Sequence, residues 1–267
     1  MKDLIDDLCL DENLESRLEI FTQKNKNKII KLCNRCNKDF NILAGCSSLM
    51  RLAVCLEYAQ TYTFDHYNRL GIPQEYFYST LKDISIWCEN YNNKGLKNYG
   101  WIKNHLKCEL FKIGRLQYQM FCCKNPTLDY KQLPFKFGDN LIYIHIPQGE
   151  KLIYKDCVDS LLSAKKFFEI YFPDFNYQFF FCESWLLFEE NFAFMNTSSN
   201  ILQFQSLFNI VYSATDDRQA IERIFGKRRI AKSNYPESTS LQRSVKAYML
   251  DGNKLGVGIG IINKNDI

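Results

Sequence analysis

The spacing of apolar residues changes at Gly114 from that of helices to that of a strand. Before this point apolar residues recur every three to four positions, so one face of each segment can be buried as a helix. After it, Leu116, Tyr118 and Met120 alternate with other residues, and alternation places successive side chains on opposite faces of a strand. The sequence therefore predicts a helical first part and a sheet-bearing second part, which is the α+β class.

The first part is expected to hold amphipathic helices at residues 11–31, 48–70, 73–91 and 101–113. Gly71 can end the second of these in a left-handed conformation, and Pro73 suits the first turn of the next. In the second part we expect strands at 116–122, 141–147, 176–184, 201–213 and 255–262, and helices at 156–171, 217–225 and 240–250. The order of these elements predicts a mixed sheet with flanking helices.

Two segments of the second part have unusual composition. NYQFFFCES at 176–184 is too continuously apolar for an exposed edge, so we expect a strand buried on both faces. GVGIG at 256–260 lacks the spacing of a dinucleotide-binding loop and no helix can follow it, so a strand narrowed by glycines is expected.

Composition excludes several classes of protein. With 46% hydrophobic and 24% charged residues the chain is globular, and 34 basic against 30 acidic residues is far from the basic surface of a dedicated nucleic-acid binder. The basic runs 24–38 and 226–229 are expected to be solvated surface, although either could meet an anion. The start is acidic and the longest apolar stretch is broken by glutamates, so we expect a cytoplasmic protein without membrane or nucleic-acid partners.

The 11 cysteines are expected to be reduced and mostly buried as small apolar side chains. Cys33 and Cys36 have the spacing of a metal or redox pair. A structural zinc site takes four ligands, and Cys46 lies ten residues on with no second pair or histidine nearby. We therefore expect no metal. A zinc-dependent nucleic-acid protein is a weaker hypothesis, ranked third after the two given below, and elemental analysis for zinc would test it.

A candidate ligand site begins at the strand LIYIHIP, residues 141–147. A strand, a glycine-containing turn and a helix start present backbone N–H groups to an anion such as phosphate. Gly149 allows close approach and Lys151 adds positive charge. His145, which shares a face of the strand with Tyr143, could act as a general base because an unperturbed imidazole has a pKa near about 6.5. A packed structural histidine is the alternative.

Polar residues also end the aromatic strand. Cys182, Glu183 and Ser184 lie at its carboxyl end, where open α/β sheets keep their sites. Arg115 and Gln117 stand at the head of the first strand, where such residues are more often structural than catalytic.

Several motifs together resemble a known family. They are GIPQEYFYSTLKDI, WIKNHLKCELFKIGRLQYQ, YIHIPQGEKL, DCVDSLLSAKKFFEIYFPDF, CESWLL, SNILQFQ and LQRSVKAYM. The chain resembles the bacterial acyltransferase family that combines an N-acyltransferase N-terminal domain with a GNAT-like C-terminal domain, well over residues 70–265 and poorly over the first 45. The resemblance implies domains at 1–124 and 125–267, the second a GNAT-like mixed sheet.

The resemblance further implies an acyl-CoA-dependent transfer of an acyl group to an amine or similar small nucleophile. Acyl-CoA would lie where the central parallel strands splay, bound by Ile146, Gln148, Gly149 and Lys151. The catalytic candidates are His145, Glu183 and Ser184. A second hypothesis is a catalytically inactive GNAT-like module that binds a small molecule or a partner, because the loop after the strand holds a single glycine.

Overall fold

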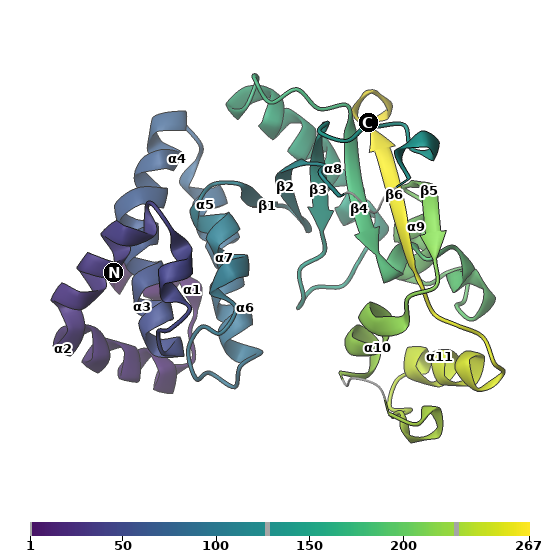
Figure 1. The fold of residues 1–267 in the computed structure, drawn as a ribbon, viewed down its shortest axis with the longest axis horizontal. Coiled ribbons are helices and arrows are strands. Elements are labelled where there is room, and N and C mark those ends of the chain that lie inside the picture. Colours follow the sequence, from purple (N-terminus) through teal and green to yellow (C-terminus); the bar gives the residue numbers. More distant parts are fainter. Residues whose placement is uncertain (1, 126–128, 227–229) are drawn as a thin grey trace. The chain divides into compact units, whose positions relative to one another are not determined.

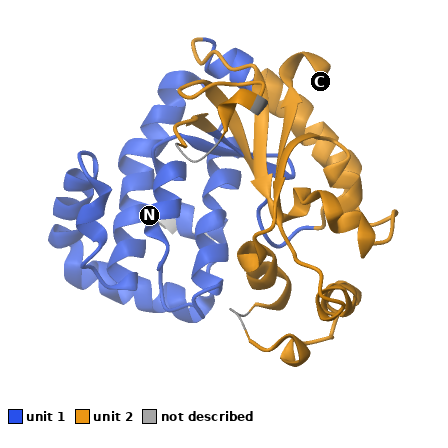
Figure 2. Ribbon diagram, turned by 45° about the vertical axis from the view of Figure 1, so that its right-hand side comes forward, with its two compact units in different colours: residues 1–119, 146–150, 167–173 blue, residues 120–145, 151–166, 174–267 orange. Residues whose placement is uncertain are grey.

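The structure is a computed structural model that describes residues 2–125, 129–226 and 230–267. Residues 227–229 of the basic run 226–229 therefore lie outside the described residues, and so does Pro126. The chain forms two compact units (Figure 2). Unit 1 comprises residues 1–119, 146–150 and 167–173, and unit 2 comprises residues 120–145, 151–166 and 174–267.

Unit 1 is mostly helical (Figure 1). Its helices are α1 (Lys2–Leu8), α2 (Glu12–Cys36), α3 (Ser48–Tyr58), α4 (Phe64–Leu70), α5 (Gln74–Leu81), α6 (Asp83–Glu89) and α7 (Tyr99–Leu106), and a π-helical turn, Ala59–Thr63, joins α3 to α4. Side chains cap two of them, since Asp11 accepts from the Leu14 N–H and Ser47 accepts from the Met50 N–H. Such caps satisfy backbone donors that have no partner inside the helix.

The predicted helices of unit 1 are confirmed with two changes. Gly71 ends α4 at φ 68°, in the left-handed conformation expected of it. The segment expected as one helix over 73–91 is divided into α5 and α6 at Lys82. The expectation of a helix over 101–113 was wrong beyond Leu106, because the chain turns at Cys108 (φ 56°) and enters a strand.

That strand, β1 (Leu110–Ile113), pairs antiparallel with β2 (Leu116–Cys122). The turn between them uses Gly114 at φ 60°, a conformation that glycine adopts without a steric cost. Leu110 and Ile113 are both buried. Their spacing of three residues suits one helix face, but it also occurs in a strand buried on both faces, which is what the structure contains.

The six strands that the structure describes form one sheet in the order β1-β2-β3-β4-β6-β5, and its mixed character confirms the prediction of a mixed sheet. The strands of unit 2 are β3 (Asn140–His145), β4 (Phe179–Ser184), β5 (Asn209–Ala214) and β6 (Val257–Asn263). β3 and β4 are parallel, and β6 runs antiparallel to both β4 and β5. The carboxyl ends of β3, β4 and β5 therefore point to one edge of the sheet.

The remaining helices are α8 (Tyr154–Tyr171), α9 (Asn200–Gln205), α10 (Asp217–Phe225) and α11 (Ser240–Leu250). The predictions at 217–225 and 240–250 are confirmed, and α11 starts with a reciprocal cap between Thr239 and Gln242. The expected strand over 201–213 was wrong in its first half. Ser199 caps α9 there by accepting from the Leu202 N–H, and β5 begins only at Asn209.

Both faces of β4 are buried, as its continuous aromatic sequence predicted. Phe181 packs edge-on against Phe135 on one face. On the other face the glycines of β6 allow a short 3-10 helix, Trp185–Leu187, to lie directly on the strand: a Cβ at Gly258 would overlap the Leu187 carbonyl. The expected glycine-narrowed strand is thus confirmed, and its cause is this close approach.

The cysteines are free thiols and eight of the 11 are buried. Burial raises the pKa of Cys33 to about 12 and that of Cys36 to about 11, so both stay protonated. No group of three or more metal-ligating side chains occurs within the described part of the chain. The basic residues of the run 24–38 lie exposed on α2 and after it. Across the residues that the structure describes, no helix combines the length and the apolar character needed to cross a membrane.

Candidate active site

Two candidate bases lie on one face of unit 2, at the carboxyl ends of β3 and β4. The parallel register pairs Tyr143 with Phe181. His145 and Glu183 each follow this pair by two residues, so both lie on the face that carries Tyr143 and Phe181. The His145 ring stacks on the Tyr143 ring with centroids 4.2 Å apart. The structure thus places His145 and Glu183, which are far apart in the sequence, on one face of the sheet.

The backbones of β3 and β4 stop pairing before these ends. The register between them comprises Ile142 with Phe180 and Tyr143 with Phe181, whereas β4 remains paired with β6 as far as Ser184. The Glu183 carbonyl instead accepts a hydrogen bond of 3.4 Å from the Tyr143 hydroxyl. A side chain therefore takes the place of backbone pairing at the point where the strands part.

Electrostatics distinguish the polar groups at this edge. The pKa of Glu183 is raised, mainly by burial and to a lesser degree by the charge of Asp216. Part of its side chain nevertheless remains exposed to solvent. Burial also raises the pKa of Tyr143, with further contributions from Cys182 and Glu183, so its phenol stays neutral. A carboxylate with a raised pKa is a better proton acceptor than an ordinary one. Glu183 has the properties of a general base within reach of a ligand.

Cys182 and Ser184 lie on the opposite face of β4 from Glu183. Cys182 is fully buried, and burial raises the pKa of its thiol, so it cannot serve as a thiolate nucleophile. The Ser184 hydroxyl accepts from the Leu186 N–H at 3.2 Å and so caps the 3-10 helix Trp185–Leu187. The three residues that the sequence grouped together are therefore divided between two faces, and a catalytic role for Ser184 stays a prediction.

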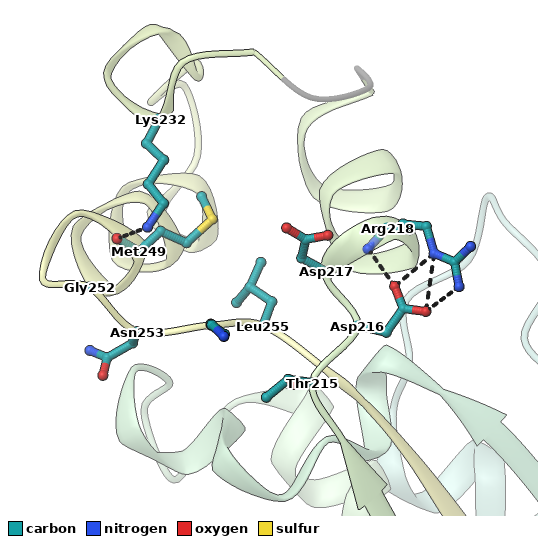
Figure 3. A pocket seen from close by; sticks show the side chains of 10 residues that line it. Thr215, Asp216, Asp217, Arg218, Lys232, Met249, Gly252, Asn253 and Leu255 are labelled. Carbon is teal, nitrogen blue, oxygen red and sulfur yellow. Dashed lines mark hydrogen bonds and ion pairs between the residues drawn. The ribbon is translucent and has the colours of Figure 1, made fainter.

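An open pocket of about 490 Å³ lies in unit 2 beyond the carboxyl end of β5 (Figure 3). Its lining comes from the start of α10, from the 3-10 turn Lys232–Asn234, from the end of α11 and from the segment between α11 and β6: Thr215, Asp216, Asp217, Arg218, Lys232, Met249, Gly252, Asn253, Lys254 and Leu255. Asp216 is paired with Arg218 at 2.6 Å. Because Asp216 also acts on the pKa of Glu183, the pocket and the candidate base are electrostatically linked.

The sequence analysis did not single out Asp216 as a neighbour of the candidate base. An aspartate directly before a predicted helix at 217–225 signals an N-cap, and Asp216 does accept from the Arg218 N–H. Its position relative to Glu183 depends on the insertion of β6 between β4 and β5, which no local pattern announces.

The loop that follows β3 belongs to unit 1 and carries most of the candidate cofactor residues. Gly149 has φ 97°, and no described atom lies within 4 Å of the position its Cβ would take. The Gln148 side chain is exposed and accepts from the Asn90 amide at 2.9 Å. Ile146 is partly buried, and Lys151, the first residue of the next stretch of unit 2, is exposed.

Residues of the β1–β2 hairpin hold this loop through two hydrogen bonds and one ion pair. The Arg115 guanidinium donates to the Pro147 carbonyl at 3.2 Å and to the Glu150 carbonyl at 2.7 Å. Lys112 forms an ion pair of 2.8 Å with the Glu150 carboxylate. The loop is therefore held at two backbone carbonyls and at the Glu150 side chain.

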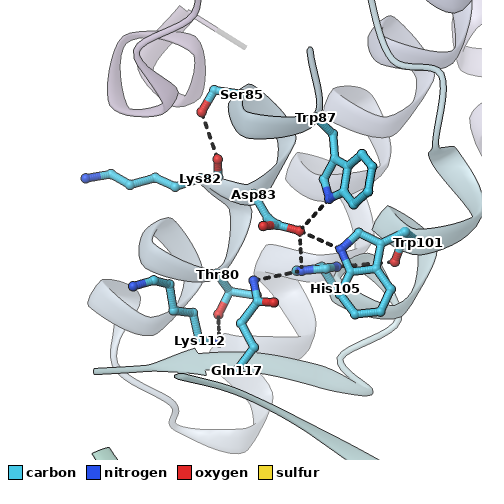
Figure 4. A network of polar contacts seen from close by, with 9 residues as sticks. All are labelled: Thr80, Lys82, Asp83, Ser85, Trp87, Trp101, His105, Lys112 and Gln117. Carbon is cyan, nitrogen blue, oxygen red and sulfur yellow. Dashed lines mark hydrogen bonds and ion pairs between the residues drawn. The ribbon is translucent and has the colours of Figure 1, made fainter. Parts of the chain in front are cut away.

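A second polar cluster lies inside unit 1 (Figure 4). The buried Asp83 carboxylate accepts from the indoles of Trp87 (3.1 Å) and Trp101 (2.6 Å) and lies 3.2 Å from the His105 Nε2. Burial alone would raise the pKa of Asp83, but hydrogen bonds from His105, Trp101 and Gln117 and the charge of His105 lower it overall. This cluster joins α6, α7 and β2, and we assign it to stability rather than to chemistry.

Comparisons with known proteins agree with this architecture. The family model of the N-acyltransferase N-terminal domain matches residues 4–108, and that of the GNAT-like C-terminal domain matches residues 110–262. A comparison with curated proteins finds no match.

Solved structures of acyltransferases are similar over almost the whole chain, and two of them illustrate the match. One is an acyltransferase in complex with decanoyl-CoA and teicoplanin, 20% identical with a TM-score of 0.78 over 98% of this chain and 87% of that one. The other is an acyltransferase in complex with CoA and 10C-teicoplanin, 20% identical with a TM-score of 0.71 and the same coverage. At this identity they show the fold, and the family follows from the matched models. The chain belongs to the family that carries the GNAT-like C-terminal domain, here preceded by an N-acyltransferase N-terminal domain.

Proposed function

We propose that this protein transfers an acyl group from acyl-CoA to an amine of a small-molecule acceptor. The observation that carries the proposal is the pair His145 and Glu183 on one face, at the edge where β3 and β4 cease to pair. The family supports the reaction type, and the similar solved structures hold decanoyl-CoA with teicoplanin or CoA with 10C-teicoplanin.

The reaction needs a base and a polarised carbonyl. The acceptor nitrogen attacks the thioester carbon, the new C–N bond forms as the C–S bond breaks, and the CoA thiolate leaves and takes up a proton. The proton lost by the amine goes to Glu183 or His145, and a raised pKa makes Glu183 a better proton acceptor than an ordinary carboxylate. A backbone N–H at the end of β3 would stabilise the developing oxyanion.

The loop after β3 is the proposed seat of the CoA diphosphate. Ile146, Gln148 and Gly149 supply backbone N–H groups, Gly149 leaves its outer side open, and Lys151 adds an exposed positive charge. Isothermal titration with acetyl-CoA and longer acyl-CoAs tests this assignment. Absence of binding to every donor at millimolar concentration would refute the proposed function.

Single substitutions separate the roles of the strand-end residues. Glu183→Gln and His145→Ala should each lower kcat for acyl transfer, by about 10²-fold or more for the true base, without weakening acyl-CoA binding. Glu189→Gln, which changes another exposed glutamate of unit 2, is the matched control. Ser184→Ala should lower stability through the lost cap and leave kcat nearly unchanged. Unchanged turnover in both base variants would remove this edge from the mechanism.

The pocket beside Asp216 is the proposed acceptor side. Asp217 at its wall offers a carboxylate that can accept a hydrogen bond from an amine, and Asp216, which is paired with Arg218, lies close enough to Glu183 to act on its pKa. The acceptor would then enter from the end of β5 and present its nitrogen to the base at the end of β4.

A catalytically inactive binding module is the second candidate, because the loop holds a single glycine. It predicts acyl-CoA binding without turnover for any amine tested. We also propose a domain division near residue 124 and a cytoplasmic location, which limited proteolysis and cell fractionation would test.

A further inference from the structure

We propose that Arg115 is a positioning residue that shapes the loop Ile146–Glu150 for the diphosphate of acyl-CoA. The inference rests on the proposed function and concerns how its donor is bound. Arg115 is only 5% exposed and lies in the hairpin turn with Gly114, directly before β2. A buried arginine needs hydrogen-bond acceptors, and two of them are carbonyls of this loop.

The geometry fixes which groups the loop can offer to a ligand. One planar guanidinium holds the carbonyls of Pro147 and Glu150, three residues apart, at 3.2 and 2.7 Å. Carbonyl oxygens bound to Arg115 face the hairpin, so they do not face an anion. Between these two anchored carbonyls lie Gln148 and Gly149, both exposed.

The two residues between the anchors supply the donors. Gln148 and Gly149 each carry a backbone N–H, whereas Pro147 has none. Gly149 adopts φ 97°, which turns the chain sharply between the anchored carbonyls. Successive N–H groups in such a turn can form a concave anion site. Arg115 therefore selects a loop conformation in which acceptors point inward and donors are left for the ligand.

Charge supports the same arrangement. Glu150 is the acidic residue of the loop, and its carboxylate would repel a diphosphate. Lys112, on the neighbouring strand β1, pairs with it at 2.8 Å. Together Lys112 and Arg115 bring two positive charges against a loop with one negative charge, so the local balance favours an anion.

The test compares two acyl donors that differ in the diphosphate. Acyl-CoA carries it, and the corresponding acyl-pantetheine does not. With the full chain, Arg115→Met should raise KM for acyl-CoA by about tenfold or more, leave kcat within about threefold, and leave KM for acyl-pantetheine unchanged. Arg115→Lys, which keeps the charge but lacks the two-pronged geometry, should recover part of the acyl-CoA affinity.

A matched control is available within unit 1. Arg51 also binds backbone carbonyls, those of Leu43 (3.0 Å) and Ala44 (2.5 Å), but in the helical region. Arg51→Met should lower stability without changing the ratio of the two KM values. Equal loss for both donors in Arg115→Met, or no loss for acyl-CoA, would overturn the positioning role.

The outcome also separates this inference from the proposed function. If the wild-type chain uses neither donor and binds no CoA, the proposed function itself fails and the inference falls with it. If the wild type works and Arg115→Met retains the acyl-CoA preference, only the inference fails. Should Arg115→Met not fold, as judged by circular dichroism, the same ratio measured for Arg115→Lys decides: a reduced preference supports the role, and an unchanged preference refutes it.

Discussion

Replacement of Asp83 by Asn removes one charge from the centre of unit 1 and changes little else in shape. The carboxylate accepts from Trp87, Trp101 and His105 at 3.1, 2.6 and 3.2 Å and is 5% exposed. Hydrogen bonds to a charged group contribute about 1.5–3 kcal/mol each and those to a neutral group about 0.5–1.5, so three weakened bonds amount to about 3 kcal/mol. We expect Asp83→Asn to lower the free energy of unfolding by about 3 kcal/mol.

Urea unfolding followed by tryptophan fluorescence measures this loss. Of the three tryptophans, Trp87 and Trp101 contact Asp83 directly, so the signal reports on unit 1. Asp65→Asn is the control, because Asp65 pairs with Arg69 on the surface and the two side chains are 63% and 67% exposed. Such pairs contribute less than about 1 kcal/mol. A loss below about 1 kcal/mol for Asp83→Asn would show that the cluster does not stabilise the unit.

The difference in unfolding free energy between the wild type and Asp83→Asn is predicted to depend on pH. The pKa of Asp83 is lower in the folded than in the unfolded chain, so its contribution to stability is complete above the unfolded value, near about 4, and is lost as pH falls through the folded value. The difference between wild type and Asp83→Asn should therefore shrink below about pH 4. A difference that stays constant from pH 6 to pH 3, in urea titrations at each pH, contradicts a charged Asp83.

Two further predictions concern unit 2. Asp216→Asn removes a charge that raises the pKa of Glu183, so the acidic limb of the pH profile of kcat/KM should move to lower pH; a limb that does not move excludes Glu183 as the titrating base. Gly258→Ala places a Cβ against the Leu187 carbonyl and should cost ~1–3 kcal/mol or more in urea unfolding. Gly45→Ala is its control, since no described atom lies within 4 Å of the new Cβ, and equal stability of both variants would contradict the close approach.

Much of the fold could be predicted from the periodicity of apolar residues and from the residues that cap helices. α10 and α11 have the predicted bounds, because each has a polar N-cap followed by a clear apolar face. The mixed sheet followed from the order of the elements, and the buried character of β4 followed from its aromatic run. These features depend on residues that lie close together in the sequence, so one sequence is enough to predict them.

The errors arose where a short apolar pattern fits two structures. Leu110 and Ile113 extended the apparent helix of α7, yet they belong to a strand because Cys108 and Gly114 turn the chain on either side. Residues 201–213 look like one strand until the cap at Ser199 is recognised. In both cases the deciding residue is a turn or a cap rather than the apolar pattern itself.

The catalytic roles of the candidate residues stay predictions, and only their placement can be compared with what the sequence indicated. His145 and Glu183 were chosen for their positions at strand ends, and the parallel register of β3 and β4 places them on one face. Cys182 and Ser184 were grouped with them, although alternation along a strand already assigns these two to the opposite face. Asp216 was missed because its neighbourhood depends on strand order, which involves residues far apart in the chain.

Arg115 shows why burial alone does not separate structural from functional residues. Its position at the head of a strand predicted a structural role, and its hydrogen bonds to two carbonyls agree with that prediction. The segment that it supports, however, is the one expected to bind the donor, so a structural contact there sets the affinity for a ligand that Arg115 itself need not touch. Stability measurements cannot detect such a role, because removal of any buried arginine would lower the stability of the protein. A ligand pair that differs only in the diphosphate can detect it, since the loss then follows the group that the loop is shaped to receive.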